Sequence, residues 1–150
     1  MQVREILRVK GSTLFTVSPA ELLADAVAAM DESDVGSLVV MDRGKMAGVL
    51  TFREVLRAVN KHKSVIGGVR VGDVMLANPV TVPPGMEVDD LRRLMVEKRS
   101  RYIPVMDGTT LMGVISFLDV ARAVLEEQGF ENRMLKNYIK NWPEAEKELE

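Results

Sequence analysis

An internal repeat constrains the fold of this 150-residue chain more than any other feature of its sequence. The matching segments are 16–19 with 81–84, 38–42 with 103–107, and 48–51 with 113–116. They share one offset of 65 positions without a gap, which is improbable by chance. A unit of roughly 60 residues is too small to bury both faces of its own sheet. The two copies are therefore expected to pack against each other.

The hydrophobic pattern predicts the same order of elements in both copies. In the first copy these are an opening helical turn at 3–7, a strand at 16–17, a helix, strands at 38–41 and 46–50, and a closing helix at 52–61. In the second copy they are a turn at 71–75, a strand at 80–82, a helix, strands at 102–106 and 111–115, and a closing helix from 117 to about 128.

The first long helix has a recognisable start signal. Ser18 is expected to be its N-cap, Pro19 suits the first helical position, and Glu21 completes a capping box. The apolar stripe that follows, at residues 22, 26 and 30, has helical spacing and predicts one buried face.

These patterns predict an α/β (α+β) protein in which two β-α-β-β-α repeats pack sheet to sheet with pseudo-two-fold symmetry. We place the first repeat at residues 1–65 and the second at 66–128. Residues 129–150 form a C-terminal amphipathic helix and an acidic tail.

The C-terminal extension carries apolar residues at helical spacing, among them Met134, Leu135, Tyr138 and Trp142. Pro143 is expected to end this helix, because proline lacks the N–H that the next turn requires. The apolar face has two candidate covers, the core of its own chain and a dimer partner, and the sequence leaves both open.

Composition disfavours several classes of function. A net charge of −2 argues against binding nucleic acid. The chain has no cysteine, and its one histidine, His62, lies in a polar run, so neither a metal site nor a catalytic residue is expected. No apolar run approaches the roughly 20 residues of a membrane span, and the N-terminus lacks the apolar core of a signal peptide. We expect a cytoplasmic protein that is not an enzyme.

A hydroxyl and a carboxylate stand at the start of each closing helix, as Thr51 with Glu54 and as Ser116 with Asp119. This spacing is typical of a capping box, and the longer Glu54 is expected to be the better cap. The same arrangement suits a nucleotide, because a helix N-terminus and a hydroxyl attract phosphate while a carboxylate accepts hydrogen bonds from a ribose diol. The two roles do not exclude each other.

Residues 1 to about 128 resemble a pair of cystathionine-β-synthase (CBS) domains, the tandem unit called a Bateman module. The motifs are VGDVM at 71–75, NPVTV at 78–82, RYIPVMD at 101–107 and GVISFLD at 113–119. The extension after residue 129 is similar to that of small bacterial CBS proteins. The resemblance implies two clefts between the repeats that bind AMP, ADP or ATP, and in some members NAD or S-adenosylmethionine. It also implies a flat homodimer.

Carried over by position, the resemblance makes Asp119 the ribose ligand and Ser116 a hydroxyl near the phosphate. The adenine would lie near Thr16, Gly36 and Ser37. In the pseudo-symmetric cleft the corresponding residues are Thr51 and Glu54, with the adenine near Thr81, Arg101 and Tyr102. Arg53 and Arg101 either reach phosphate or belong to a solvated face, and Tyr102 either stacks on the purine or lines the sheet.

The extra methylene of Glu54 moves its carboxylate by about 1.5 Å relative to an aspartate. We therefore expect the Asp119 cleft to be the stronger of the two.

The leading hypothesis is a non-enzymatic sensor that binds an adenine nucleotide and signals to an unidentified protein partner in trans. The alternatives are a constitutive dimer or scaffold in which Ser116 and Asp119 only cap a helix, and a sensor of S-adenosylmethionine.

Overall fold

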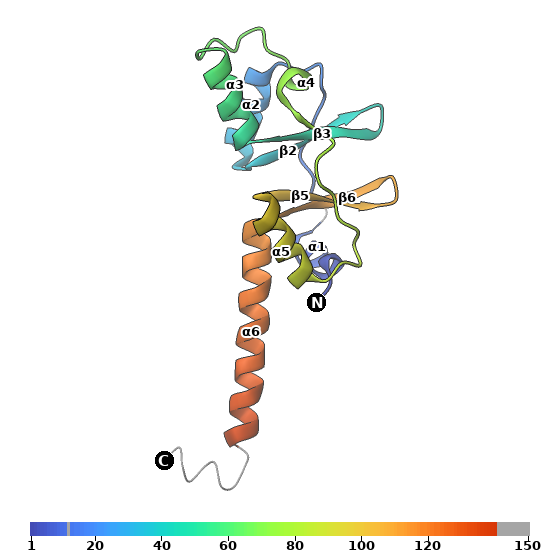
Figure 1. Ribbon diagram of the computed structural model, residues 1–150, viewed down its shortest axis with the longest axis vertical. Coiled ribbons are helices and arrows are strands. Elements are labelled where there is room, and N and C mark those ends of the chain that lie inside the picture. The colour runs from blue at the N-terminus through green and yellow to red at the C-terminus, as the bar shows by residue number, and fades with distance from the viewer. Residues whose placement is uncertain (12, 141–150) are drawn as a thin grey trace.

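The computed structural model describes residues 1–11 and 13–140 (Figure 1). Its elements are α1 (Val3–Lys10), β1 (Thr16–Val17), α2 (Leu23–Ser33), β2 (Ser37–Asp42), β3 (Lys45–Thr51), α3 (Phe52–Lys61), α4 (Val71–Val74), β4 (Leu76–Ala77), α5 (Val88–Lys98), β5 (Tyr102–Asp107), β6 (Thr110–Ser116) and α6 (Phe117–Lys140). The two predicted hairpins and the start of both closing helices are confirmed.

The strands form two sheets, which lie one above the other in Figure 1. The sheet of the first repeat has the order β1-β2-β3-β4, with β1 parallel to β2 and the other pairs antiparallel. The sheet of the second repeat is the antiparallel pair β5-β6, and β3 and β6 contact each other. Both hairpins shift register at the equivalent place, after Val40 and after Val105. The predicted sheet-to-sheet packing of two similar units is confirmed.

The predicted second-repeat strand at 80–82 is wrong, because only an isolated bridge between Val82 and Val105 forms there. Val82 donates its N–H to Pro104 and accepts from the N–H of Met106. Prolines 79, 83 and 84 surround this residue, and a proline has no N–H with which to extend a ladder.

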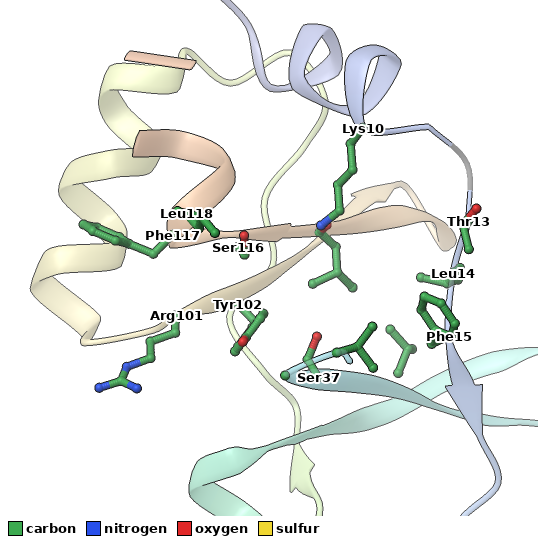
Figure 2. Close-up of a pocket in the computed structure, with 14 residues that line it drawn as sticks. Lys10, Thr13, Leu14, Phe15, Ser37, Arg101, Tyr102, Ser116, Phe117 and Leu118 are labelled. Atoms are coloured by element: carbon green, nitrogen blue, oxygen red, sulfur yellow. The ribbon is translucent and has the colours of Figure 1, made fainter. Parts of the chain in front are cut away.

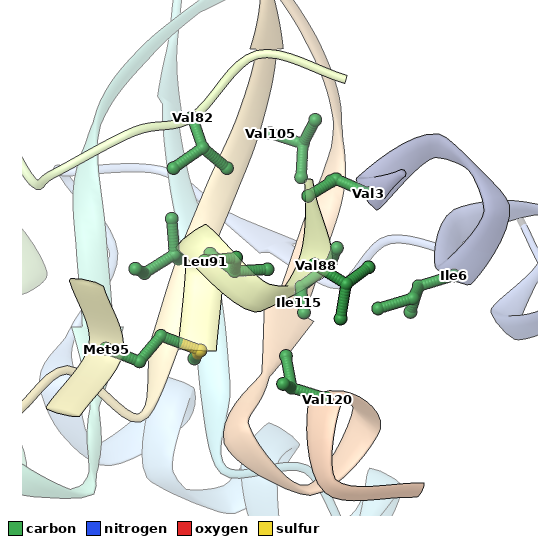
Figure 3. Packing of buried hydrophobic residues seen from close by; sticks show 10 residues of the cluster. Val3, Ile6, Val82, Val88, Leu91, Met95, Val105, Ile115 and Val120 are labelled. Atoms are coloured by element: carbon green, nitrogen blue, oxygen red, sulfur yellow. The ribbon is translucent and has the colours of Figure 1, made fainter. Parts of the chain in front are cut away.

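Each repeat buries its own core, but the opening helices are exchanged between them. Val3 and Ile6 of α1 belong to the core of the second repeat, together with residues such as Val88 and Ile115 (Figure 3). Conversely, Val71 of α4 is buried in the core of the first repeat. Each hydrophobic core therefore contains residues from both repeats.

Equivalent backbone hydrogen bonds fix both exchanged helices. The bonds are Val3 N–H to Met86 O at 2.9 Å, Arg4 N–H to Pro84 O at 3.0 Å, Val71 N–H to Glu21 O at 2.9 Å, and Gly72 N–H to Pro19 O at 2.9 Å. The acceptors in the two sets are related by the same offset of 65 positions as the repeats themselves. The pseudo-symmetry predicted from the sequence thus also holds for the hydrogen bonds that attach each opening helix to the other repeat.

The first opening helix is longer than the second. Helix α1 has 8 residues and α4 has 4. Leu7 and Thr16 are nine positions apart, whereas their counterparts Met75 and Thr81 are six positions apart. The first repeat therefore carries an additional helical turn, which ends at Lys10.

The expected start of the first long helix is wrong. Helix α2 begins at Leu23, with Leu22 as its N-cap. Ser18 and Glu21 do contact each other, but within a turn that precedes the helix, where the Ser18 Oγ accepts from the N–H of Ala20. The start is set by the exchange, because Leu23 donates its N–H to Val69 in the segment leading to α4.

The closing helix of the second repeat does not end near residue 128. Helix α6 continues without interruption to Lys140 and projects away from both sheets (Figure 1). Met134 and Leu135 are exposed, so the described part of the extension does not cover the core of its own chain. The predicted contribution of Trp142 and the helix end at Pro143 lie outside the described residues. The boundaries at 65, 66, 128 and 129 remain predictions.

The exchange predicts that α1 stabilises the second repeat. Ile6 is 6% exposed in that core, and Ile6→Ala is expected to lower the free energy of unfolding by about 2–4 kcal/mol. Val9→Ala is the control, because Val9 lies on the same helix and is 86% exposed. Urea denaturation measures the loss, and amide hydrogen exchange should show it first in β5 and β6. If Ile6→Ala and Val9→Ala lowered the free energy of unfolding equally, the packing of α1 in the core of the second repeat would be contradicted.

Candidate functional site

Both closing helices begin with a capping box. At α3 the Thr51 Oγ1 accepts from the N–H of Arg53 at 3.3 Å, and the Thr51 N–H donates to Glu54 Oε1 at 3.0 Å. At α6 the Asp119 N–H donates to Ser116 Oγ at 3.0 Å, and the Ser116 N–H donates to Asp119 Oδ2 at 2.9 Å. The shorter aspartate also closes its reciprocal pair, so a capping box forms at both helices, and the expectation that Glu54 is the better cap stays a prediction.

The two carboxylates differ in accessibility. Glu54 is 5% exposed, and its Oε1 also accepts the hydroxyl proton of Thr51 at 2.8 Å. The Asp119 side chain is 17% exposed, and its second oxygen, Oδ1, accepts no hydrogen bond from the described residues. Asp119 therefore retains capacity to bind a hydroxyl, whereas Glu54 is directed into its own helix start.

A cavity of about 430 Å³, here called the Ser116 cavity, lies between the two repeats (Figure 2). Its wall is formed by the following residues: Lys10, Thr13, Leu14, Phe15, Val35, Gly36, Ser37, Val39, Arg101, Tyr102, Val114, Ser116, Phe117 and Leu118. The structure therefore brings Gly36 and Ser37 of the first repeat to Ser116 of the second. Thr16 is exposed and does not line the cavity; its neighbour Phe15 does.

A smaller cavity of about 240 Å³, the Thr51 cavity, occupies the related position at the start of α3. It is lined by Thr51, Phe52, Arg53, Leu56, Arg101 and Tyr102. Neither Glu54 nor Thr81 is among its lining residues. Arg53 reaches the cavity wall, but its guanidinium donates to the Arg99 carbonyl at 2.7 Å, at the C-terminal end of α5.

Tyr102 and Arg101 line both cavities, so the strand entry of β5 separates the two sites. The Tyr102 ring lies directly against Gly36, where a Cβ atom would stand 1.8 Å from the phenolic oxygen. Glycine at position 36 is therefore what lets the ring occupy this position. In Figure 2 the Arg101 guanidinium points away from the other lining residues.

Lys10 is the charged residue of the Ser116 cavity that the sequence analysis missed, as it also missed the apolar lining residues Phe15, Val35 and Val39. The Lys10 Nζ donates to Asp119 Oδ2 at 2.7 Å and to the Val114 carbonyl at 2.8 Å. Lys10 is 109 positions from Asp119 in the chain, and only the exchange of α1 onto the second repeat brings the two together. No local pattern in the sequence indicates this contact.

The ion pair sets the protonation of Asp119. Burial, the largest single influence, raises the pKa of the carboxyl. The hydrogen bonds from Lys10 and from the Ser116 N–H, together with the positive charge of Lys10, outweigh burial and hold the pKa below its ordinary value of 3.8. The carboxylate is therefore ionised throughout the neutral range and available as an acceptor.

A depressed pKa in the folded state predicts how stability changes with pH. The stabilisation from the Lys10–Asp119 pair is fully present above the ordinary pKa of 3.8 and is lost as the pH falls through the lower folded value. Lys10→Met should lower the free energy of unfolding at pH 7 by up to about 1 kcal/mol. The difference from the wild type should shrink below pH 3.8.

Urea denaturation followed by circular dichroism, from pH 7 to pH 3, measures this effect. Lys45→Met removes the same charge from the exposed hairpin between β2 and β3 and serves as the control. If the wild type exceeds Lys10→Met in free energy of unfolding by the same amount at pH 3 as at pH 7, the difference does not come from the Lys10–Asp119 ion pair.

Two further properties concern the described residues only. Within residues 1–11 and 13–140, no three His, Cys, Asp or Glu side chains are grouped so that they could hold a metal ion. No helix in the same part of the chain has the length and apolar character that a transmembrane span requires.

Comparison with known proteins identifies the repeat. The sequence profile of the CBS domain matches residues 3–61 and again 71–126. The chain is similar to the CBS domain-containing protein CBSX3, mitochondrial, of Arabidopsis thaliana, with 36% identity over 120 residues. That alignment covers 77% of this chain and 58% of the relative, so the match spans little more than half of the relative's length.

Two solved structures share the architecture. A CBS-domain protein from Burkholderia ambifaria MC40-6 has a TM-score of 0.80 and 34% identity, covering 85% of this chain and 96% of that chain. The structure of CBSX2 in complex with AMP has a TM-score of 0.71 and 28% identity, covering 85% of this chain and 98% of that chain.

Proposed function

The chain belongs to the CBS-domain family, and from that premise we propose that it is a non-enzymatic sensor that binds an adenine nucleotide in the Ser116 cavity. The observation that carries this proposal is the convergence of both repeats on one cavity, at the N-terminus of the longest helix. The complex of CBSX2 with AMP supports an adenosine derivative as the ligand.

Asp119 is proposed to hold the ribose. A carboxylate accepts two hydrogen bonds from a 2′,3′-diol, and Oδ1 of Asp119 is open to the first of them. The second would be made at Oδ2, which at present accepts from Lys10 and from the Ser116 N–H.

Ser116 and the start of α6 are proposed to hold the phosphate. The Ser116 hydroxyl accepts from the Asp119 N–H, which leaves its own proton available to a phosphate oxygen. Helix α6 has 24 residues, and the positive end of its dipole points to this region. Arg101 lines the cavity, but its guanidinium points away from the other lining residues, so its contact with phosphate stays a prediction.

The adenine is proposed to lie in the apolar part of the cavity. Phe15, Val35 and Val39 supply apolar surface there, and Gly36 and Ser37 supply backbone and hydroxyl groups. Tyr102 faces the same space from β5, so its ring both lines the sheet and offers a surface to the purine.

The Thr51 cavity is proposed to be the weaker site. It is smaller, its carboxylate is buried in the helix cap, and Arg53 is bonded to the end of α5. AMP, ADP and ATP are the proposed ligands of the Ser116 cavity, with NAD and S-adenosylmethionine as further candidates. Occupancy would alter the contact between the repeats and so inform a protein partner in trans.

Asp119→Asn tests nucleotide binding while it keeps an oxygen that accepts from the Ser116 N–H. AMP at 100 times its dissociation constant should stabilise the wild type by about 2.7 kcal/mol. This corresponds to about 5–10 °C in the unfolding midpoint of a chain of this size. The shift should fall by more than half in Asp119→Asn, measured by thermal unfolding.

Asp73→Asn is the matched control, because Asp73 accepts from the Arg70 N–H in the equivalent cap of α4, away from both cavities. A wild type that responds to none of AMP, ADP, ATP, NAD and S-adenosylmethionine would favour the scaffold function. In that case the two capping boxes would be the whole role of Ser116 and Asp119.

We also propose that the protein is a homodimer. Exposed apolar side chains lie on the α6 extension, where Phe130, Met134 and Leu135 are each more than half exposed. Such surface is unfavourable in water unless a second chain covers it.

Light scattering should therefore give twice the 16.7 kDa mass of the chain. Met134→Lys should shift the protein toward the monomer, because it places a charge in the apolar face. Asn132→Lys, which adds the same charge to another exposed position of α6, should leave the mass unchanged. A monomeric wild type would refute the dimer.

A further inference from the structure

The Lys10 ammonium at the Ser116 cavity has no part in the ribose and adenine contacts proposed above. Lys10 belongs to the cavity wall, whereas Asp119, to which it is bonded at 2.7 Å, does not. The wall therefore presents the ammonium rather than the carboxylate. An ammonium carries three donors, and the described residues accept from two of them, at Asp119 and at Val114. One N–H of Lys10 remains for a ligand.

Lys10 lines the Ser116 cavity, whereas the cations that line the Thr51 cavity are Arg53 and Arg101. Lys10 ends the additional turn of α1, and the shorter α4 ends at Val74 and passes directly into β4, which pairs with β3. No lysine is present among the lining residues of the Thr51 cavity. The exchange of opening helices thus delivers a lysine to the Ser116 cavity and not to the Thr51 cavity.

Few other charges face this ammonium. Of the residues that line the Ser116 cavity, only Arg101 carries a second full charge, and its guanidinium points away from the cavity (Figure 2). The remaining wall consists of apolar, glycine and hydroxyl-bearing residues. Asp119 is the one carboxylate bonded to Lys10 within the described chain.

A ligand diol and Lys10 compete for Asp119. One of the two bonds of a bidentate diol requires Oδ2, which now accepts from Lys10 and from the Ser116 N–H. A displaced ammonium without a new partner is unfavourable in a partly enclosed site. A 5′-phosphate supplies that partner on the same molecule, whereas adenosine supplies none and the positively charged sulfonium of S-adenosylmethionine repels the ammonium.

We propose that Lys10 makes the Ser116 cavity select adenosine 5′-phosphates over uncharged or positively charged adenosine derivatives, by exchanging Asp119 for the phosphate when the ribose binds. This inference rests on the proposed nucleotide-binding function and names the ligand class of that site. The additional turn of α1 is then the element that specifies the ligand.

Isothermal titration calorimetry of the full chain with AMP and with adenosine tests the inference through the ratio of the two dissociation constants. In the wild type, AMP should bind at least about tenfold more tightly than adenosine. In Lys10→Met the affinity for AMP should fall about 10–100-fold, while that for adenosine is unchanged or rises. The ratio should therefore approach one. S-adenosylmethionine should gain affinity in the same variant.

Two variants separate charge selection from a structural effect. Lys10→Arg keeps the positive charge and should keep most of the preference for AMP. Lys45→Met removes a lysine from the exposed β2–β3 hairpin and should leave both dissociation constants unchanged. Raising the salt concentration should weaken the binding of AMP by the wild type more than by Lys10→Met.

The outcomes are distinguishable. A Lys10→Met protein that binds both ligands with the wild-type ratio overturns the role of Lys10 and leaves the nucleotide sensor intact. A wild type that binds AMP and adenosine equally well also overturns the role of Lys10 and leaves the nucleotide sensor intact. If the wild type binds no adenosine derivative at all, the proposed function fails and the role of Lys10 fails with it.

Discussion

The structure depends on the exchange of the two opening helices. Val3 and Ile6 of the first repeat complete the core of the second, and Val71 completes the core of the first. Because neither core is complete without a segment of the other repeat, the two sheets are held face to face. The same exchange carries the chain across the gap between the repeats, so that Lys10 and Phe15 become part of the cavity wall. The exchange of the opening helices therefore explains both the packing of the two repeats and the composition of the cavity wall.

The helix caps contain the atoms that stabilise each helix start and that the proposed function also assigns to ligand binding. Ser116 and Asp119 satisfy the free N–H groups at the start of α6, as Thr51 and Glu54 do at α3. What distinguishes the two caps is their surroundings. Glu54 is buried within its own helix start, whereas Asp119 keeps one oxygen open and is bonded to a lysine at the cavity. The repeats are similar in sequence, but the sites that they form are unequal.

Sequence reasoning predicted the elements that local chemistry controls. The hairpins and the start of α3 at Phe52 follow from alternating apolar residues, turn residues and caps. It failed where the structure of a segment depends on residues that are distant in the chain. Helix α2 begins at Leu23 because Val69 accepts its N–H, and the segment at 80–82 forms only a bridge at Val82 between prolines. Gly36, Ser37 and Ser116 line one cavity, as their predicted proximity requires. Neither cavity is lined by Thr16, Thr81, Glu54 or Asp119, and the roles of all these residues toward a ligand stay predictions.

The sequence by itself determined that the protein consists of two similar α/β units with a hydroxyl and a carboxylate at each closing helix, because an unbroken offset and capping spacing are local properties of the chain. Only the tertiary structure decided which core each opening helix enters and which charged group stands beside Asp119. Those outcomes depend on contacts such as Lys10 with Asp119, which join residues 109 positions apart. No local pattern encodes such a contact, because it exists only after the two repeats have exchanged their helices.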